Sequence, residues 1–497
     1  MSHNNITLEP KTILSNYATK NEIFWKKIAE SETLRVFNMM AKNVTAYHKF
    51  LILNKTNPNQ VNSFLDFYKI PQIFKKNYFY KYPFSEISTK NSFPNSPAVM
   101  TSTSGSTGVP TYFARNEKID FQYSIIAEYF LKNGKKGSSL LIDCFGMGVW
   151  IGGLITYQAF RNVALRGYPV SILTPGINKK EIFHCLKNLA PNFDNIILAG
   201  YPPFIKDIID ESKKEGISLK QFNIRLIFAA ESFTENFREY VSKNCGIKDA
   251  FRDTLNIYGS AELGAMAHET PTSIFIRKIA ISHPEVYSSL FKKSRIPTLA
   301  QYNPMFINFT TENNEILITS DNIVPFCKYK IGDLGGTYYL SEIIVAFSKY
   351  GIDLKHEAKN AGIKLENMPF VYIYERSDFS TTLYGLQIYP QTIKLAIEDS
   401  KLEKYLSGKF TLETFFDKQN NQSLKINLEL KSQKYPSHKL YLLTEKLILK
   451  KLLETNSEFK ELTSMISFKR IKPKLVFWNF NDPNYFKSGI KQQWIKN

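Results

Sequence analysis

The sequence predicts an α/β fold in two domains, and three observations lead to this prediction. A chain of 497 residues is too long for one compact core, so at least two domains are expected. From about residue 97, short apolar runs alternate with helical patterns, which is typical of largely parallel strands. Strand formers and turn residues then become frequent near residues 371–390. We therefore predict a large N-terminal domain over residues 1–375 and a small α+β domain over residues 376–497.

The large domain begins with a mostly helical, aromatic-rich segment of about 90 residues. A helix is expected over residues 119–134, with Asp120 as N-cap and Gly134 ending it in a left-handed conformation. Apolar runs that are expected to form strands occupy residues 98–101, 168–173, 195–200 and 224–231.

The small domain has one clear strand and one clear helix. Residues 423–431 alternate apolar and polar side chains, which places four apolar residues on one face of a strand: Leu424, Ile426, Leu428 and Leu430. Residues 439–454 have a helical pattern. This mixture supports the prediction of an α+β domain.

The most apolar segment, residues 139–160, is long enough to suggest a membrane span. However, it contains Asp143 and several glycines, so a buried strand, a glycine turn and a core helix explain it better. The first residues, "MSHNNITLEPKT", show no basic-then-apolar signal pattern. We expect no stable membrane insertion.

The formal net charge of +19 fits either a lysine-rich surface or a site for anionic substrates such as nucleotides. The lysines are scattered and no basic helix stands out, so nucleic-acid binding is not expected. The four cysteines form no CxxC pair, which argues against a zinc site or a disulfide framework. A cytoplasmic protein is consistent with this cysteine usage.

The stretch "TSTSGSTGVPT", residues 101–111, has the composition of a linker and also of a phosphate-binding loop. Glycine lets a backbone approach phosphates closely, and hydroxyl groups donate hydrogen bonds to them. A Walker loop is excluded, because the glycines are too close together and Lys118 is the first lysine that follows. Composition alone leaves both interpretations open.

Four motifs taken together resemble those of the adenylate-forming superfamily, which includes acyl-CoA synthetases. "TSGSTGVPT" resembles its phosphate loop, and "NIYGSAE" (256–262) resembles its adenine and magnesium motif. "YKIGDLG" (329–335) resembles its ribose motif, and "ERSDFSTTLYGLQIYP" (375–390) resembles its hinge. They occur in the family's order over roughly residues 75–495. The resemblance implies a large adenylation domain and a small mobile C-terminal domain.

Within the superfamily, the chain is most similar to the phenylacetate–CoA ligase and capsule-biosynthesis-type ligases. Thr111 stands where many members have lysine, and this branch often has threonine. "FAAES", around Glu231, and "PQIFKKNYFYKYPFSEI", residues 71–87, also resemble segments of this branch.

The resemblance implies roles for individual residues. Glu262 would bind Mg²⁺, Asp333 would accept both ribose hydroxyls, and Arg376 would contact ribose or phosphate. Asp378 would be a hinge residue. The remaining candidates for ATP binding are Thr103, Ser104, Gly105, Ser106, Thr107, Gly108, Ala230, Glu231, Tyr258, Gly259 and Ser260. As alternatives, Glu262 or Glu231 could begin a helix, Asp333 could belong to a turn, Tyr258 could be a core residue and Arg376 a surface ion pair.

A C-terminal lysine reaches the α-phosphate in this family, usually within Ser-Gly-Lys. Here Ser488 and Gly489 are followed by Ile490 and Lys491, so the catalytic lysine is either Lys491, which we favour, or Lys487. Both could instead belong to a solvated basic tail.

The acyl pocket is expected near Phe145, Trp150 and Tyr201, and His268 could face it. These aromatic side chains could equally be core residues. The functional prediction is an AMP-forming ligase that activates a carboxylic acid with ATP and Mg²⁺ and transfers it to coenzyme A. Two alternatives remain, namely a non-CoA acceptor such as an amine or a carrier-protein thiol, and a catalytically inactive nucleotide-binding homologue. The sequence leaves a homodimer open.

Overall fold

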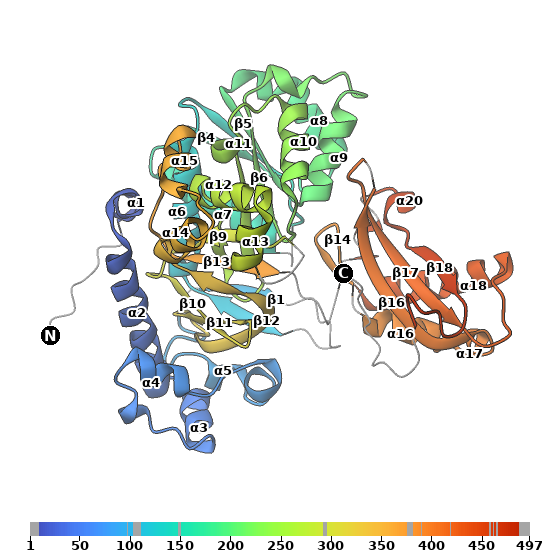
Figure 1. The fold of residues 1–497 in the computed structure, drawn as a ribbon, viewed down its shortest axis with the longest axis horizontal. Coiled ribbons are helices and arrows are strands. Elements are labelled where there is room, and N and C mark those ends of the chain that lie inside the picture. Colours follow the sequence, from blue (N-terminus) through green and yellow to red (C-terminus); the bar gives the residue numbers. More distant parts are fainter. Residues whose placement is uncertain are drawn as a thin grey trace. The chain divides into compact units, whose positions relative to one another are not determined.

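The computed structural model of the chain describes residues 9–96, 98–102, 111–147, 151–291, 296–374, 381–388, 390–417, 419–456, 459–460, 462–463 and 466–486. They form two compact units, the first made mostly from residues 9–374 and the second from residues 381–486. The first unit contains a large mixed sheet, and the second contains a three-stranded sheet (Figure 1).

One half of the large sheet is wholly parallel, as the alternating sequence pattern predicts. Its strands are β3 (Ser139–Asp143), β4 (Val170–Leu173), β5 (Asn195–Gly200), β6 (Ile224–Ala229) and β7 (Thr254–Ser260). The order in the sheet is β4-β3-β5-β6-β7. Every residue of β5 is buried, which explains why this strand is a continuous apolar run rather than an alternating one.

Helices cover both faces of this parallel half. The connecting helices are α7 (Ile151–Leu165), α8 (Lys179–Asn188), α9 (Pro202–Ser212), α10 (Glu235–Cys245) and α11 (Ala250–Asp253), and α6 (Glu117–Asn133) precedes β3. Figure 1 shows α8, α9 and α10 on one side of β5 and β6, with α6 and α7 on the other. This arrangement confirms the predicted α/β architecture.

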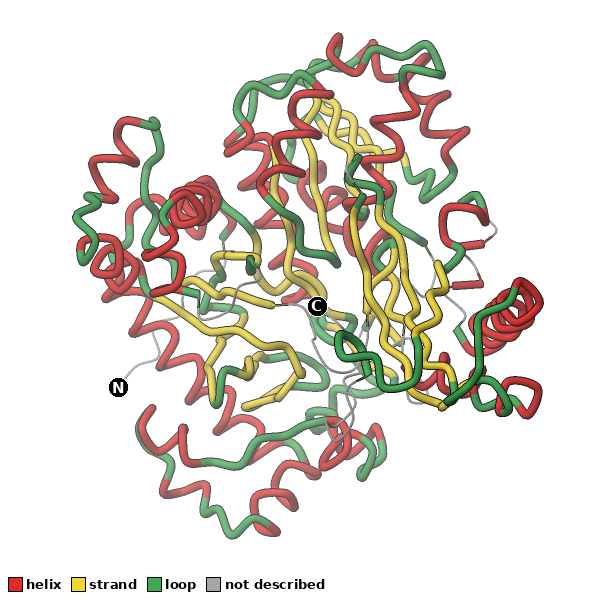
Figure 2. Tube along the Cα trace, turned by 45° about the vertical axis from the view of Figure 1, so that its right-hand side comes forward, coloured by secondary structure: helices red, strands yellow, loops and turns green. Residues whose placement is uncertain are grey.

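The other half of the sheet is antiparallel, so the prediction of a largely parallel sheet is correct for one half only. Its strands are β8 (Gly264–His268), β9 (Thr298–Gln301), β10 (Ile307–Glu312), β11 (Glu315–Ser320), β12 (Phe326–Tyr338) and β13 (Phe370–Tyr374). They continue the sheet from β7 in the order β8-β9-β13-β12-β11-β10. Figure 2 shows the strands of the chain in yellow, with helices in red around them. Asn313 and Asn314, both with positive φ, form the tight turn between β10 and β11.

The N-terminal segment is helical, as predicted, and covers the antiparallel half. Its helices are α1 (Pro10–Thr19), α2 (Glu22–Asn43), α3 (Thr45–Leu53), α4 (Phe64–Lys69) and α5 (Phe84–Ile87). Phe37 and Phe67 from this segment share a buried core with Phe309 and Ile318 of β10 and β11. A second core on β9 and β13 includes side chains from α12 (Pro271–Ser282), α13 (Pro284–Leu290), α14 (Leu340–Ser348) and α15 (Leu354–Asn360).

The predicted strand at residues 98–101 forms β1 (Val99–Ser102), which pairs with β2 (Tyr112–Arg115) outside the large sheet. The expected ends of the following helix are wrong in detail. Asn116 is the N-cap of α6, and Asp120 lies in its first turn, 3.2 Å from the buried Arg115 guanidinium. Gly134 has φ −99° and is not left-handed. The glycine is needed for space, since a Cβ there would lie 2.3 Å from the Arg225 guanidinium.

The apolar run from residue 139 forms strand β3 and helix α7, as predicted. Leu140, Leu141 and Ile142 are buried in the sheet, with exposed fractions of 1% or less. Among the described residues, no helix combines the length and apolar character needed to cross a bilayer. The apolar character of the strand part of this segment is therefore explained by burial within the first unit.

The second unit is α+β. Its sheet contains β16 (Leu406–Phe416), β17 (Gln422–Leu430) and β18 (Lys474–Trp478), with β17 antiparallel to β16 and parallel to β18. The other elements are β14 (Thr381–Leu383), β15 (Leu386–Ile388), α16 (Pro390–Ile397), α17 (Ser400–Glu403), α18 (His438–Thr455) and α20 (Phe468–Ile471). The apolar face predicted for residues 424–430 is fully buried, which confirms the alternating strand.

Candidate active site

Two motifs far apart in the sequence meet at Tyr258 and Asp333. The Tyr258 hydroxyl donates a 2.6 Å hydrogen bond to Oδ2 of Asp333. Tyr258 lies on β7 and Asp333 on β12, which are separated in the sheet by β8, β9 and β13. In a flat sheet these strands would be roughly 19 Å apart, so the contact requires the sheet to curl between them. The structure thus joins the candidate adenine and ribose residues.

Glu262 lies in the turn between β7 and β8 and is 3% exposed. Its Oε1 accepts a 3.3 Å hydrogen bond from the Tyr329 hydroxyl and lies 3.0 Å from the Lys75 ammonium. Tyr329 is the first residue of "YKIGDLG", so the ribose motif also supports the candidate magnesium ligand. Sequence reasoning missed the role of Lys75, although it lies within the quoted lysine and Tyr-Pro-Phe segment.

The turn that carries Glu262 is tightly built. A Cβ at Gly259 would lie 2.7 Å from the carbonyl oxygen of Gly264, so this position requires glycine. The Ser260 hydroxyl accepts a 3.3 Å hydrogen bond from the Leu263 amide. Through this bond, Ser260 stabilises the turn from β7 into β8.

The hairpin β1–β2 is tied to the same turn. Thr101 of β1 donates a 2.9 Å hydrogen bond to the carbonyl oxygen of Ala261, the residue before Glu262. The six predicted phosphate-loop residues, Thr103 to Gly108, lie outside the described residues. What the structure places beside the turn is therefore the strand that leads into them.

The candidate adenine loop follows β6. Ala230 has a left-handed backbone, with φ +73°, which is uncommon for a residue other than glycine. Nδ2 of Asn256 donates a 2.9 Å hydrogen bond to the carbonyl oxygen of Glu231 and so connects β7 to this loop. Oδ1 of Asn256 is buried and has no hydrogen-bond partner among the described residues. Asn256 was part of the quoted "NIYGSAE", but sequence reasoning gave it no role.

The candidate acyl-pocket residues follow other parallel strands. Phe145 lies just after β3 and is 1% exposed, and Tyr201 directly follows β5 and is buried. His268 ends β8, with Nδ1 2.8 Å from the carbonyl oxygen of Glu269 and its ring beside Tyr129. Burial lowers the pKa of His268 to about 4, so it is neutral at physiological pH. Trp150 lies outside the described residues.

The remaining candidates, Arg376, Asp378, Lys487 and Lys491, also lie outside the described residues. Among the residues that are described, no group of three or more His, Cys, Asp or Glu side chains could hold a metal ion by itself. Mg²⁺ commonly binds through one or two carboxylates together with substrate phosphates and water. The single buried carboxylate of Glu262 fits this kind of site and does not fit a site built from protein ligands alone.

Comparison with known proteins identifies the fold. No family model matches the sequence, and no curated protein matches it. Among solved structures, 2-hydroxyisobutyryl-CoA ligase with 2-HIB-AMP and CoA in the thioesterification state has a TM-score of 0.64 at 14% identity, covering 100% of this chain and 95% of that one. The same ligase in its postadenylation state with 2-HIB-AMP has a TM-score of 0.53 at 14% identity, covering 97% and 90%. The chain thus has the fold of an adenylate-forming CoA ligase, with a C-terminal subdomain, which confirms the predicted fold class.

Proposed function

We propose that the protein is an AMP-forming ligase that activates a carboxylic acid with ATP and transfers the acyl group to coenzyme A. The observation that carries this proposal is the 2.6 Å hydrogen bond from Tyr258 to Asp333, because it joins two of the quoted motifs across 75 residues of sequence. In the first half-reaction a carboxylate oxygen would bond to the α-phosphorus and pyrophosphate would leave. In the second, the thiol would attack the acyl carbonyl and AMP would leave.

The nucleoside would be held from both halves of the sheet. Tyr258 fixes one carboxylate oxygen of Asp333 by its hydrogen bond, and the carboxylate as a whole has lone pairs to accept both ribose hydroxyls. Oδ1 of Asn256, which has no partner among the described residues, would accept a hydrogen bond from the 6-amino group of adenine. Ala230 and Glu231 would border the base, and Ser260 and Gly259 would lie near the α-phosphate.

Glu262 would bind Mg²⁺ together with the phosphates. When bound, the ion would reduce the repulsion between the incoming carboxylate and the triphosphate. Before binding, the Lys75 ammonium at 3.0 Å balances the charge of this buried carboxylate. The loop of residues 103–108, which β1 leads into, would hold the β- and γ-phosphates through backbone N–H groups.

The finer features of the proposal follow the resemblance of the sequence. Phe145, Trp150 and Tyr201, with His268 nearby, would line the acyl pocket of a phenylacetate–CoA ligase-like enzyme. The C-terminal domain would begin at Arg376, with Asp378 as its hinge. It would bring Lys491, or alternatively Lys487, to the α-phosphate during adenylation.

ATP–pyrophosphate exchange tests the first half-reaction. We expect exchange that depends on an added acid from a panel of aryl and fatty acids, and AMP release that CoA stimulates. Acid-dependent exchange without CoA-stimulated AMP release would indicate that the acceptor is a molecule other than coenzyme A. An absence of exchange with every acid would contradict the proposed activity.

A further inference from the structure

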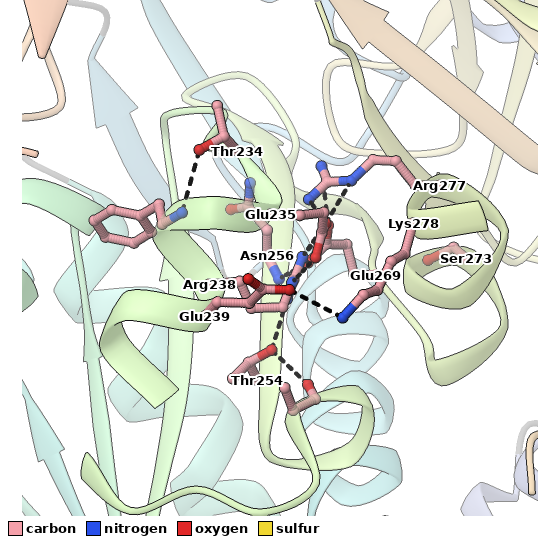
Figure 3. Close-up of polar contacts among 12 residues, drawn as sticks. Thr234, Glu235, Arg238, Glu239, Thr254, Asn256, Glu269, Ser273, Arg277 and Lys278 are labelled. Carbon is pink, nitrogen blue, oxygen red and sulfur yellow. Dashed lines mark hydrogen bonds and ion pairs between the residues drawn. The ribbon is translucent and has the colours of Figure 1, made fainter. Parts of the chain in front are cut away.

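Four buried charged side chains form a network beside β7. They are Glu235 and Arg238 of α10, Glu269 after β8 and Arg277 of α12, and each is 9% exposed or less. Figure 3 shows the two guanidinium groups converging on the two carboxylates, close to Asn256. Arg238 donates to Glu235 at 2.9 Å and to both oxygens of Glu269 at 2.8 Å. Arg277 donates to Glu235 at 2.9 Å and lies 3.3 Å from Glu269.

The network contains two acidic and two basic side chains, and removing them from water costs free energy. Burial alone would raise the pKa of Glu235, but the two guanidinium groups outweigh it and lower this pKa to about 2. Glu235 is therefore ionised at neutral pH. Because apolar residues of similar volume often stabilise a core as well as a buried ion pair does, stability alone does not explain this arrangement. Its directional hydrogen bonds point to a role in orientation.

Glu269 is the member of the network that holds Asn256. Its Oε2 accepts a 2.9 Å hydrogen bond from the backbone amide of Asn256. The backbone amide of Glu269 in turn donates a 2.8 Å hydrogen bond to the backbone carbonyl of Asn256. Arg238 reaches the start of the same strand through a 2.6 Å hydrogen bond to Thr254. The Asn256 side chain in turn holds the carbonyl of Glu231, next to the left-handed Ala230. A continuous chain of bonds thus leads from the arginines to the candidate adenine loop.

We infer that Glu269 is a positioning residue for adenine recognition: held by Arg238 and Arg277, it fixes Asn256 and, through Asn256, the loop at Ala230 and Glu231. This inference rests on the proposed function, in which Asn256 accepts a hydrogen bond from the 6-amino group of adenine. Glu269 would act through Asn256 and would not itself touch the nucleotide.

Glu235 provides a matched control. Both carboxylates are buried and both interact with Arg238 and Arg277, so Glu235→Gln and Glu269→Gln remove the same charge from the same network. Of the two, Glu269 accepts from the Asn256 backbone amide through Oε2, and its Oε1 faces both guanidinium groups. In Glu269→Gln the remaining oxygen would face the guanidinium groups and the NH₂ group would take the place of Oε2, so the bond from the Asn256 backbone amide would be lost. A difference between the variants therefore reports on the position of Asn256 rather than on charge balance.

The test measures binding of AMP and IMP to the full-length chain by isothermal titration calorimetry, with Tm for each variant. IMP carries a carbonyl oxygen in place of the 6-amino group and so has no donor at position 6 for Asn256. We expect Glu269→Gln to weaken AMP binding about tenfold and IMP binding less than about twofold. Glu235→Gln should change both affinities by the same factor. Glu269→Asp, which keeps the charge but is one methylene shorter, should also lose selectivity for AMP.

Each alternative outcome is decisive. If wild-type protein does not bind AMP, or does not prefer AMP to IMP, the proposed adenine contact is wrong and the inference falls with it. If the wild type prefers AMP and all variants retain that preference while their Tm falls, the inference alone is overturned and the proposed function stands. Failure of both Glu269 variants to fold would show a purely structural role and would also overturn it.

Discussion

Four candidate site residues in the parallel half of the central sheet follow the ends of strands, whereas Tyr258 lies within β7 and Asp333 lies within a strand of the antiparallel half. Phe145, Tyr201 and Glu231 come after β3, β5 and β6, and Glu262 follows β7. Their positions agree with the general rule that ligands bind beyond the carboxyl ends of parallel strands. Asp333 and Tyr329, by contrast, lie inside the long strand β12.

This difference indicates a division of roles. The Asp333 carboxylate is held by the 2.6 Å hydrogen bond from Tyr258 on another strand, which suits a fixed contact to the part of a substrate that does not react. A side chain on a turn depends on side-chain contacts, such as the ion pair of Lys75 with Glu262, and these can be exchanged when ligands bind. We therefore expect strand-end groups to affect mainly kcat and the mid-strand group to affect mainly KM for ATP.

The largest expected effect is that of Glu262→Gln. A neutral amide binds Mg²⁺ poorly, so kcat for ATP–pyrophosphate exchange should fall about 100- to 1,000-fold with a smaller change in KM. The amide oxygen can still accept the hydrogen bond from Tyr329, so the fold should be retained. The measurement is steady-state exchange at several Mg²⁺ concentrations, with circular dichroism to verify folding. An unchanged kcat would remove Glu262 from the chemistry.

The next largest effect is expected for Asp333→Asn. It should raise KM for ATP about 10- to 100-fold and change kcat little, because one charged acceptor of the ribose hydroxyls is lost. In the wild type, 2′-deoxy-ATP should be a poor substrate, whereas the variant should hardly distinguish it from ATP. Tyr258→Phe is the control, since it removes only the donor to Asp333 and should raise KM about three- to tenfold. A fall in kcat alone on Asp333→Asn would contradict the proposed division of roles.

The sequence predicted the parallel half of the fold better than the antiparallel half, for a physical reason. The parallel strands are continuous apolar runs separated by helices, as at residues 195–200, and this signal is local. The antiparallel strands β9 to β12 follow one another with no helix between them, and pairs such as β13 with β9 are set by contacts between segments about 70 residues apart. The helix ends were missed for a similar reason, because buried Arg115 and Arg225 determine the environments of Asp120 and Gly134.

The residues of the candidate site also differ in how far the sequence could predict them. Glu262, Tyr258 and Asp333 could be found because each lies in a short motif with a recognisable order of residues. The supporting residues lie in tertiary contacts that the motifs do not encode: Lys75 comes from the N-terminal segment, and Glu269 acts from beyond β8. No periodicity or spacing in the sequence relates Lys75 to Glu262.

Lys75→Met tests whether the turn at Glu262 depends on an exchangeable contact. Without the ammonium, the buried carboxylate lacks its cation, so the free protein should lose about 1–2 kcal/mol of stability, given that Lys75 is 27% exposed. MgATP should restore much of the loss by supplying another cation. The measurement is Tm with and without MgATP, and Lys49→Met, which breaks the exposed pair with Glu86, is the control. Equal losses in both variants, with or without MgATP, would argue against this dependence.

The smallest effect is expected where the helix α6 meets the segment leading into β13. The Tyr129 hydroxyl donates a 2.7 Å hydrogen bond to Glu366, and burial raises the pKa of Glu366 to about 7. Because the pKa of Glu366 is higher in the folded than in the unfolded state, the contribution of Glu366 to stability is fully present below the ordinary glutamate pKa. This contribution is lost as the pH rises through 7. Glu366→Gln mimics the protonated form and can still accept from Tyr129. It should therefore raise Tm by a few degrees at pH 8, as measured by scanning calorimetry, and leave it unchanged at pH 4. Equal shifts at both pH values would show that packing, and not titration of Glu366, sets the stability of this contact.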